Sequence, residues 1–142
     1  MVMSDGVDER LILVVEDNLV NQKVISAMIG KLGYRADIVA DGLQAVAAAS
    51  DNLYDMIFMD CQMPVMDGYA ATLEIRQAEG QGTSRGRVPI VAMTANALSE
   101  DREQCFAVGM DDFISKPVML DVLKSIIDKW CPERDSNPRP SP

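Results

Sequence analysis

The sequence predicts an α/β domain with a doubly wound parallel sheet, and three observations support this class. Short apolar runs alternate with segments whose apolar residues recur every three or four positions, the pattern of strands that alternate with amphipathic helices. The central run, residues 56–60, is apolar up to its final aspartate, as expected for a strand buried on both faces. The length of 142 residues is that of one domain.

The five expected strands are short, and polar or turn residues follow each of them. The first stops at an acidic pair, the second is weaker and stops at Asp41-Gly42, and the fourth carries Pro89 near its start, where proline is tolerated. The expected strands are residues 11–15, 36–40, 56–60, 88–94 and 112–114.

Five helices are expected between and after these strands. The first ends at Gly33, as a C-cap glycine would end it, and the fourth starts at Ser99, an N-cap residue followed by two acids that favour the helix dipole. The expected helices cover about 20–32, 43–49, 69–79, 99–108 and 122–130. Strict alternation at this length favours right-handed crossovers and a flavodoxin-like five-stranded parallel sheet with strand order 2-1-3-4-5 and five helices.

Composition excludes several classes of function. A formal net charge of -9 argues against binding of nucleic acid by bulk electrostatics. The apolar runs are too short for a membrane span, and no secretory signal is recognisable, so no direct membrane contact is expected. The absence of histidine removes histidine catalysis and any histidine phosphoacceptor within the chain. The three cysteines lack metal-ligand spacing and are expected to be reduced thiols in a cytoplasmic protein.

The ends of the chain differ in composition from its middle. Residues 1–9 are polar and without periodicity, and residues 132–142 are rich in proline and polar residues. We therefore expect a flexible leader over 1–9, a single folded domain over 10–131 and a disordered tail over 132–142.

Five polar residues fall at the carboxyl ends of the expected strands. These are Glu16 and Asp17 after the first strand, Asp60 at the end of the third, Thr94 at the end of the fourth and Lys116 just past the fifth. In the expected strand order the first and third strands flank the topological switch point, where open α/β sheets bind their ligands.

This constellation suits phosphoryl transfer. Three carboxylates in one crevice repel one another unless they take up protons or share a cation. Oxygen ligands without histidine or cysteine fit a hard ion, which is Mg²⁺ with Mn²⁺ or Ca²⁺ as alternatives. Lys116 adds a positive charge and Thr94 a neutral donor for the oxygens of a phosphoryl group. Asp60 would be the nucleophile and would form an aspartyl-phosphate.

Each of these residues also has an ordinary structural explanation. Glu16 and Asp17 could only complement a helix dipole, Thr94 is a common β-branched strand residue, Lys116 could be a solvated surface charge, and Asp60 could simply open a turn. Five independent structural roles do not predict that all five residues fall at strand ends, and the functional interpretation is therefore favoured.

The motifs that contain these residues resemble the receiver domain of two-component response regulators. They are Val15-Glu16-Asp17-Asn18, Met59 to Gly68 (MDCQMPVMDG), Ala92-Met93-Thr94-Ala95 and Lys116-Pro117. They match that family in order and spacing, and the resemblance covers about residues 10 to 130.

The resemblance implies a role for each site residue. Asp60 would accept a phosphoryl group from a phosphohistidine on a histidine kinase or a histidine phosphotransfer protein. Asp17, Asp60 and the backbone carbonyl of Gln62 would ligate Mg²⁺, with Glu16 acting mainly through water. Thr94 and Lys116 would contact the phosphoryl oxygens. In the family the Lys116-Pro117 bond is usually cis.

The resemblance also implies a switch and a pair of residues that tune its lifetime. Phe113 matches the switch aromatic that couples to Thr94, and it lacks the hydroxyl of the tyrosine often found there. Gln62 and Asn96 match positions that contact or shield the attacking water. The domain would phosphorylate and dephosphorylate itself without being an enzyme in its own right, as a monomer or a weak phosphorylation-dependent dimer.

Within the family the chain looks most similar to receivers at the carboxyl end of hybrid sensor histidine kinases, and it would then be the cytoplasmic domain of a larger protein. A free-standing single-domain response regulator is the alternative. An aspartate-nucleophile phosphatase is disfavoured because such enzymes need a second aspartate two residues after the nucleophile, where this chain has Gln62. A phosphorylation-independent adaptor would not need all five site residues, and an FMN-binding flavodoxin would be repelled by Glu16-Asp17.

Overall fold

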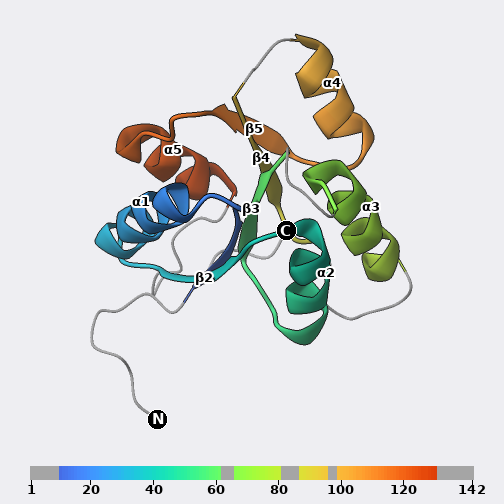
Figure 1. Ribbon diagram of the computed structural model, residues 1–142, viewed down its shortest axis with the longest axis horizontal. Coiled ribbons are helices and arrows are strands. Elements are labelled where there is room, and N and C mark those ends of the chain that lie inside the picture. Colours follow the sequence, from blue (N-terminus) through green and yellow to red (C-terminus); the bar gives the residue numbers. More distant parts are fainter. Residues whose placement is uncertain (1–9, 62–65, 81–86, 96–98, 131–142) are drawn as a thin grey trace, which may run out of the picture.

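Figure 1 shows the computed structural model, which describes residues 10–61, 66–80, 87–95 and 99–130. The expected leader and tail lie outside these residues, so the expected limits of the domain stay predictions.

One five-stranded sheet forms the centre of the domain. Its strands run in the order β2-β1-β3-β4-β5, and every neighbouring pair is parallel. The strands are β1 (Leu11–Val15), β2 (Arg35–Val39), β3 (Met56–Asp60), β4 (Ile90–Thr94) and β5 (Asp112–Ser115). The predicted fold class and strand order are therefore confirmed.

The fourth strand is shorter than predicted, since it begins at Ile90 and not at residue 88. Pro89 has no N–H to contribute to a ladder, although its carbonyl accepts a hydrogen bond from Ile57 N at 2.9 Å. The N–H of Val88 turns instead to the Glu79 carboxylate, 2.8 Å away.

Five helices connect and follow the strands, and several begin earlier than the apolar pattern indicated. Asn18, Asp41 and Asp67 are N-caps whose side chains accept hydrogen bonds from backbone N–H groups three residues later, at 3.0, 2.8 and 2.9 Å. The helices are α1 (Leu19–Lys31), α2 (Gly42–Asp51), α3 (Gly68–Glu79), α4 (Ser99–Ala107) and α5 (Leu120–Trp130).

Helices α1 and α5 cover one face of the sheet, and α2, α3 and α4 lie on the other (Figure 1). Each face has its own apolar core, because alternate residues of a strand point to opposite faces. Ile12, Val14 and Phe58 pack toward α1 and α5, whereas Leu13 and Ile57 pack toward the other helices. All five residues of β3 are buried, as predicted for the central strand.

Candidate functional site

The carboxyl-terminal edge of the sheet gathers the side chains that the sequence singled out. Asp60 is the last residue of β3, Thr94 is the last residue of β4, and Glu16, Asp17 and Lys116 directly follow β1 or β5. Because parallel strands end at the same edge, residues up to 100 positions apart become neighbours here. Within this group the structure joins Glu16, Asp17, Asp60 and Lys116 in direct proximity.

Three carboxylates form the acidic part of this site. Glu16, Asp17 and Asp60 each offer one oxygen, and these oxygens lie within 4.8 Å of one another. Glu16 and Asp60 are buried, with 1% and 3% of their surfaces exposed, and Asp17 is exposed. Buried carboxylates this close repel one another, so the site favours a cation.

One ammonium group reaches two of these carboxylates. Lys116 Nζ lies 3.0 Å from Asp60 Oδ2 and 3.2 Å from Glu16 Oε1. Burial by itself would lower the pKa of Lys116, but the hydrogen bond and charge of Asp60, with the charge of Glu16, outweigh it and raise that pKa. The backbone N–H of Lys116 donates to the Thr94 carbonyl at 2.8 Å, and the bond to Pro117 is cis, as the resemblance implied.

Glu16 is held in place by the segment that follows it. Its Oε2 accepts hydrogen bonds from Asn18 N at 3.1 Å and from Asn21 Nδ2 at 3.4 Å, and its carbonyl accepts one from Gln22 Nε2 at 2.7 Å. Its Oε1 is buried and accepts no hydrogen bond from the described residues, although Lys116 lies within ion-pair distance. A buried carboxylate oxygen without an aligned donor is what an oxygen-preferring cation would satisfy.

Two glycines let the surrounding backbone pack closely, and the sequence identified them only as turn residues. A Cβ on Gly68 would lie 2.3 Å from the Asp60 carbonyl oxygen, and one on Gly42 would lie 2.4 Å from the Met66 carbonyl oxygen. The start of α3 can therefore press directly against the end of β3 only because residue 68 has no side chain.

The two predicted switch residues lie on neighbouring strands. Thr94 is buried and Phe113 is partly buried. The Phe113 ring packs edge-on against Phe106 of α4, with centroids 6.4 Å apart, and the Arg102 guanidinium lies 5.3 Å from its centre. Gln62 and Asn96, the predicted lifetime-tuning residues, lie outside the described residues.

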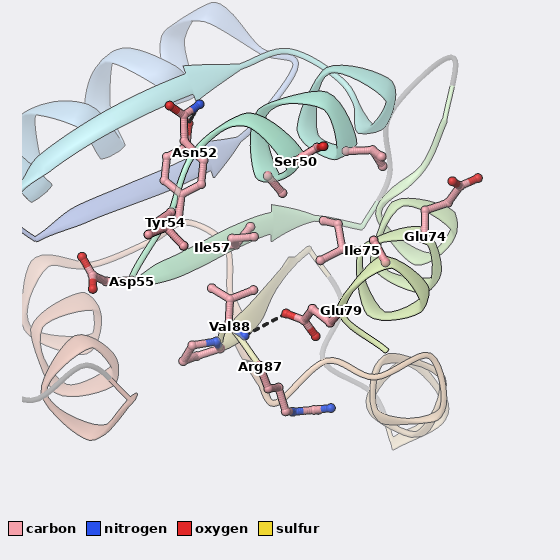
Figure 2. Close-up of a pocket in the computed structure, with 15 residues that line it drawn as sticks. Ser50, Asn52, Tyr54, Asp55, Ile57, Glu74, Ile75, Glu79, Arg87 and Val88 are labelled. Carbon is pink, nitrogen blue, oxygen red and sulfur yellow. Dashed lines mark hydrogen bonds between the residues drawn. The ribbon is translucent and has the colours of Figure 1, made fainter. Parts of the chain in front are cut away.

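A cavity of about 450 Å³ lies at the opposite end of the sheet (Figure 2). Its walls come from α2, α3 and the segments that lead into β3 and β4, and they include Tyr54, Ile57, Ile75 and Val88. A hydrogen bond between Val88 N and Glu79 crosses one side of it. None of the predicted site residues lines this cavity, so it is separate from the acidic site.

The fold and the site together define a flavodoxin-like domain whose switch point carries a cluster of three carboxylates beside Lys116. The chain belongs to the response regulator receiver domain family, whose model matches residues 12–128.

Curated signalling proteins are similar to this chain over most of its length. It is 41% identical to part of the hybrid signal transduction protein dokA of Dictyostelium discoideum, covering 94% of this chain and 8% of dokA. It is also 41% identical to part of the sensor histidine kinase RcsC of Salmonella typhimurium, covering 87% of this chain and 12% of that kinase. The chain thus spans only a small part of the length of these relatives.

Two solved structures are informative. One is the receiver domain of a sensor histidine kinase from Pseudomonas aeruginosa PAO1 with a magnesium ion coordinated in its active site cleft; it is 52% identical, with a TM-score of 0.77 over 86% of this chain and 97% of that chain. The other is a co-crystal of the Saccharomyces cerevisiae histidine phosphotransfer protein Ypd1 with the receiver domain of Ssk1, at 31% identity and a TM-score of 0.82 over 89% of this chain and 91% of that chain.

No helix in the described part of the chain is both long and apolar enough to cross a membrane.

Proposed function

We propose that Asp60 accepts a phosphoryl group from a phosphohistidine on a histidine kinase or a histidine phosphotransfer protein. The observation that carries this proposal is the placement of the Asp60 carboxylate at the end of β3, 3.0 Å from Lys116 Nζ and beside Glu16 and Asp17. The co-crystal of a similar receiver domain with a phosphotransfer protein supports a partner of this kind.

We infer that Glu16, Asp17 and Asp60, with the backbone carbonyl of Gln62, hold Mg²⁺, and that Mn²⁺ can replace it. The metal ligands would all be oxygens, and Glu16 Oε1 is buried and accepts no hydrogen bond from the part of the chain that the structure describes, so a hard cation fits the site. A similar receiver domain is described with magnesium in its active site cleft. When bound, the ion would offset the negative charge of the carboxylates and of the incoming phosphoryl group.

The transfer itself exchanges one bond for another. An oxygen of the Asp60 carboxylate attacks the phosphorus, the bond between phosphorus and the partner's imidazole nitrogen breaks, and that nitrogen keeps the electron pair. Lys116 then exchanges its hydrogen bond with Asp60 Oδ2 for one to a phosphoryl oxygen. Hydrolysis by water returns the free carboxylate and inorganic phosphate, and Gln62 and Asn96 tune its rate.

The conformational effect of phosphorylation is expected to reach the surface through Thr94 and Phe113. A hydroxyl at the end of β4 can donate to a phosphoryl oxygen, and a shift of Thr94 toward it would leave space that Phe113 can fill. Phe113 also contacts Phe106 and Arg102 of α4. The change would therefore alter the packing between β5 and α4.

We further infer that the folded unit over 10–131 is the cytoplasmic receiver domain of a hybrid sensor histidine kinase, acting as a monomer or a weak phosphorylation-dependent dimer. The similarity to short segments of much longer kinases supports this parent protein. A free-standing response regulator is distinguished from it by the length of the native protein on an immunoblot.

Intact-mass measurement tests the acceptor directly. Incubation with Mg²⁺ and acetyl phosphate should add one phosphoryl group, and chelation of the metal or the Asp60→Asn substitution should abolish the addition. Asp128→Asn removes an exposed carboxylate that pairs with Lys124 at the surface, and it should leave the addition unchanged. An adduct that survives Asp60→Asn, or no adduct at all in the unsubstituted chain, would overturn the proposal.

A further inference from the structure

Two buried thiols that phosphoryl transfer does not use lie between β3 and α4. Cys61 directly follows Asp60, and Cys105 belongs to α4. Their Sγ atoms are 3.9 Å apart, and only 2% and 0% of their surfaces are exposed. In this structure the two thiols are not joined by a disulfide.

Cys105 also marks the point where α4 joins the core. Among the α4 residues whose side chains the structure describes, 102 to 107, Cys105 alone is buried, and the neighbouring Phe106 is 48% exposed. By contrast, α3 buries four residues, and α1 and α5 bury two each. Because residues 102–107 of α4 bury only one side chain, local opening of this part of the helix is a low-cost route by which a small oxidant reaches the thiols.

We propose that Cys61 and Cys105 form a reversible intramolecular disulfide when the protein is exposed to a peroxide. This bond would link α4 covalently to the residue that directly follows β3. A disulfide joins sulfurs about 2 Å apart, so the two Sγ atoms must approach by roughly another 2 Å. Rotation of the two side chains and a small shift of α4 supply that movement.

The reaction balances with the peroxide as the oxidant. One thiol is first oxidised to a sulfenic acid, and the peroxide is reduced with release of water or an alcohol. The second thiol then attacks the sulfenic sulfur, the S–S bond forms and a second water leaves with the oxygen. Two S–H bonds are lost in total, and a dithiol reductant such as dithiothreitol restores both. This chemistry is independent of the proposed phosphoryl transfer.

The chain has a third cysteine, Cys131, which lies outside the described residues and serves as an internal control. The 142-residue chain is treated with a small excess of hydrogen peroxide, and the remaining thiols are then alkylated. The expected product has lost two hydrogen atoms and carries one alkyl group in place of three. Peptide mapping should place the link between residues 61 and 105, and dithiothreitol should reverse it.

Substitutions and hydrogen exchange complete the test. Cys131→Ala should still form the link, and Cys105→Ala should not. Amide exchange in α4 should slow about ten-fold in the oxidised protein, because the bond opposes local opening. A link that involves Cys131, oxidation that stops at sulfinic acid, or unchanged exchange in α4 would overturn the proposal. Mapping of the unsubstituted chain decides the question even if a variant folds poorly.

Discussion

At the carboxyl-terminal edge of the sheet three carboxylates meet one ammonium group, whereas at the amino-terminal edge the Asp111 carboxylate meets two guanidinium groups. Asp111 accepts hydrogen bonds from Arg76 at 2.7 Å, from Arg87 at 2.8 Å and from the backbone N–H of Ile90 at 2.9 Å. At the other edge, Glu16 Oε1 is buried and accepts no hydrogen bond from the described residues.

The two edges of the sheet differ in whether their carboxylates have enough hydrogen-bond donors. The partly buried Asp111 carboxylate, which accepts hydrogen bonds from several donors, fixes the amino-terminal ends of β4 and β5 against α3. A buried carboxylate cluster with too few donors is destabilising by itself and gains from a cation or a phosphoryl group. The amino-terminal edge therefore stabilises the domain, and the carboxyl-terminal edge is expected to be stabilised by a bound cation.

The largest effect is expected from removal of the Asp111 carboxylate at the amino-terminal edge of the sheet. Asp111→Ala removes one of the two carboxylates that pair with Arg76, whose side chain is 12% exposed, and frees the N–H of Ile90. The free energy of unfolding should fall by about 3 kcal/mol, measured by urea denaturation. Asp128→Ala, in an exposed helical pair with Lys124, is the control and should change it by less than about 0.5 kcal/mol. Equal losses in both variants would contradict the comparison.

Gly68→Ala is expected to shift the backbone at the carboxyl-terminal edge of the sheet. The new Cβ would lie 2.3 Å from the Asp60 carbonyl oxygen, so β3 and α3 must move apart at a cost of about 2 kcal/mol. Thermal unfolding should show the loss, and the rate of phosphorylation by acetyl phosphate should fall with it. Gly30→Ala is the control, because a Cβ there meets no atom within 4 Å. A wild-type phosphorylation rate in Gly68→Ala would show that Asp60 tolerates the movement.

Asp60→Asn should separate stability from function most directly. It removes one of three clustered carboxylates and keeps an oxygen that can accept from Lys116, so in metal-free buffer the free energy of unfolding should rise by about 1 kcal/mol. Phosphorylation should be lost. Calorimetry without Mg²⁺ measures the expected gain in stability, and calorimetry with Mg²⁺ measures the expected loss of stabilisation by the metal. A lower stability would mean that Lys116 already balances the acidic cluster.

The smallest effect concerns the pH dependence of stability, through Asp112 at the amino-terminal edge of the sheet. Burial opposes ionisation of Asp112, but hydrogen bonds from Trp130, from its neighbour's backbone and from Lys129 outweigh it and lower the pKa of Asp112. A lowered pKa in the folded state gives stability that is present above about pH 4 and is lost as pH falls through the folded value. Asp112→Asn should therefore flatten the acid limb of a plot of melting temperature against pH. An unchanged acid limb would assign that dependence to other carboxylates.

The sequence was sufficient to bring the predicted site residues to one edge of the sheet, because each of them ends a strand or lies within two residues of its end. Asp60 stands at the end of an apolar run, and strand order then places Glu16, Asp17 and Lys116 beside it. The stabilising edge was not predictable in this way. Arg76 and Asp111 are 35 residues apart, and neither belongs to a motif. Arg10, expected at the border of a loose leader, is buried and donates to the Tyr34 hydroxyl at 2.9 Å.

By itself, the sequence determined the fold class, the strand order and the edge at which the site forms, because hydrophobic periodicity and turn residues act locally and parallel crossovers leave few topologies. Only the tertiary structure decided which oxygen of Glu16 accepts no hydrogen bond from the described residues, why residue 68 must be glycine, and that Cys61 and Cys105 are in contact. These features depend on distances between segments far apart in the chain, where differences of a few tenths of an ångström matter. Such distances are set by packing and not by any local pattern.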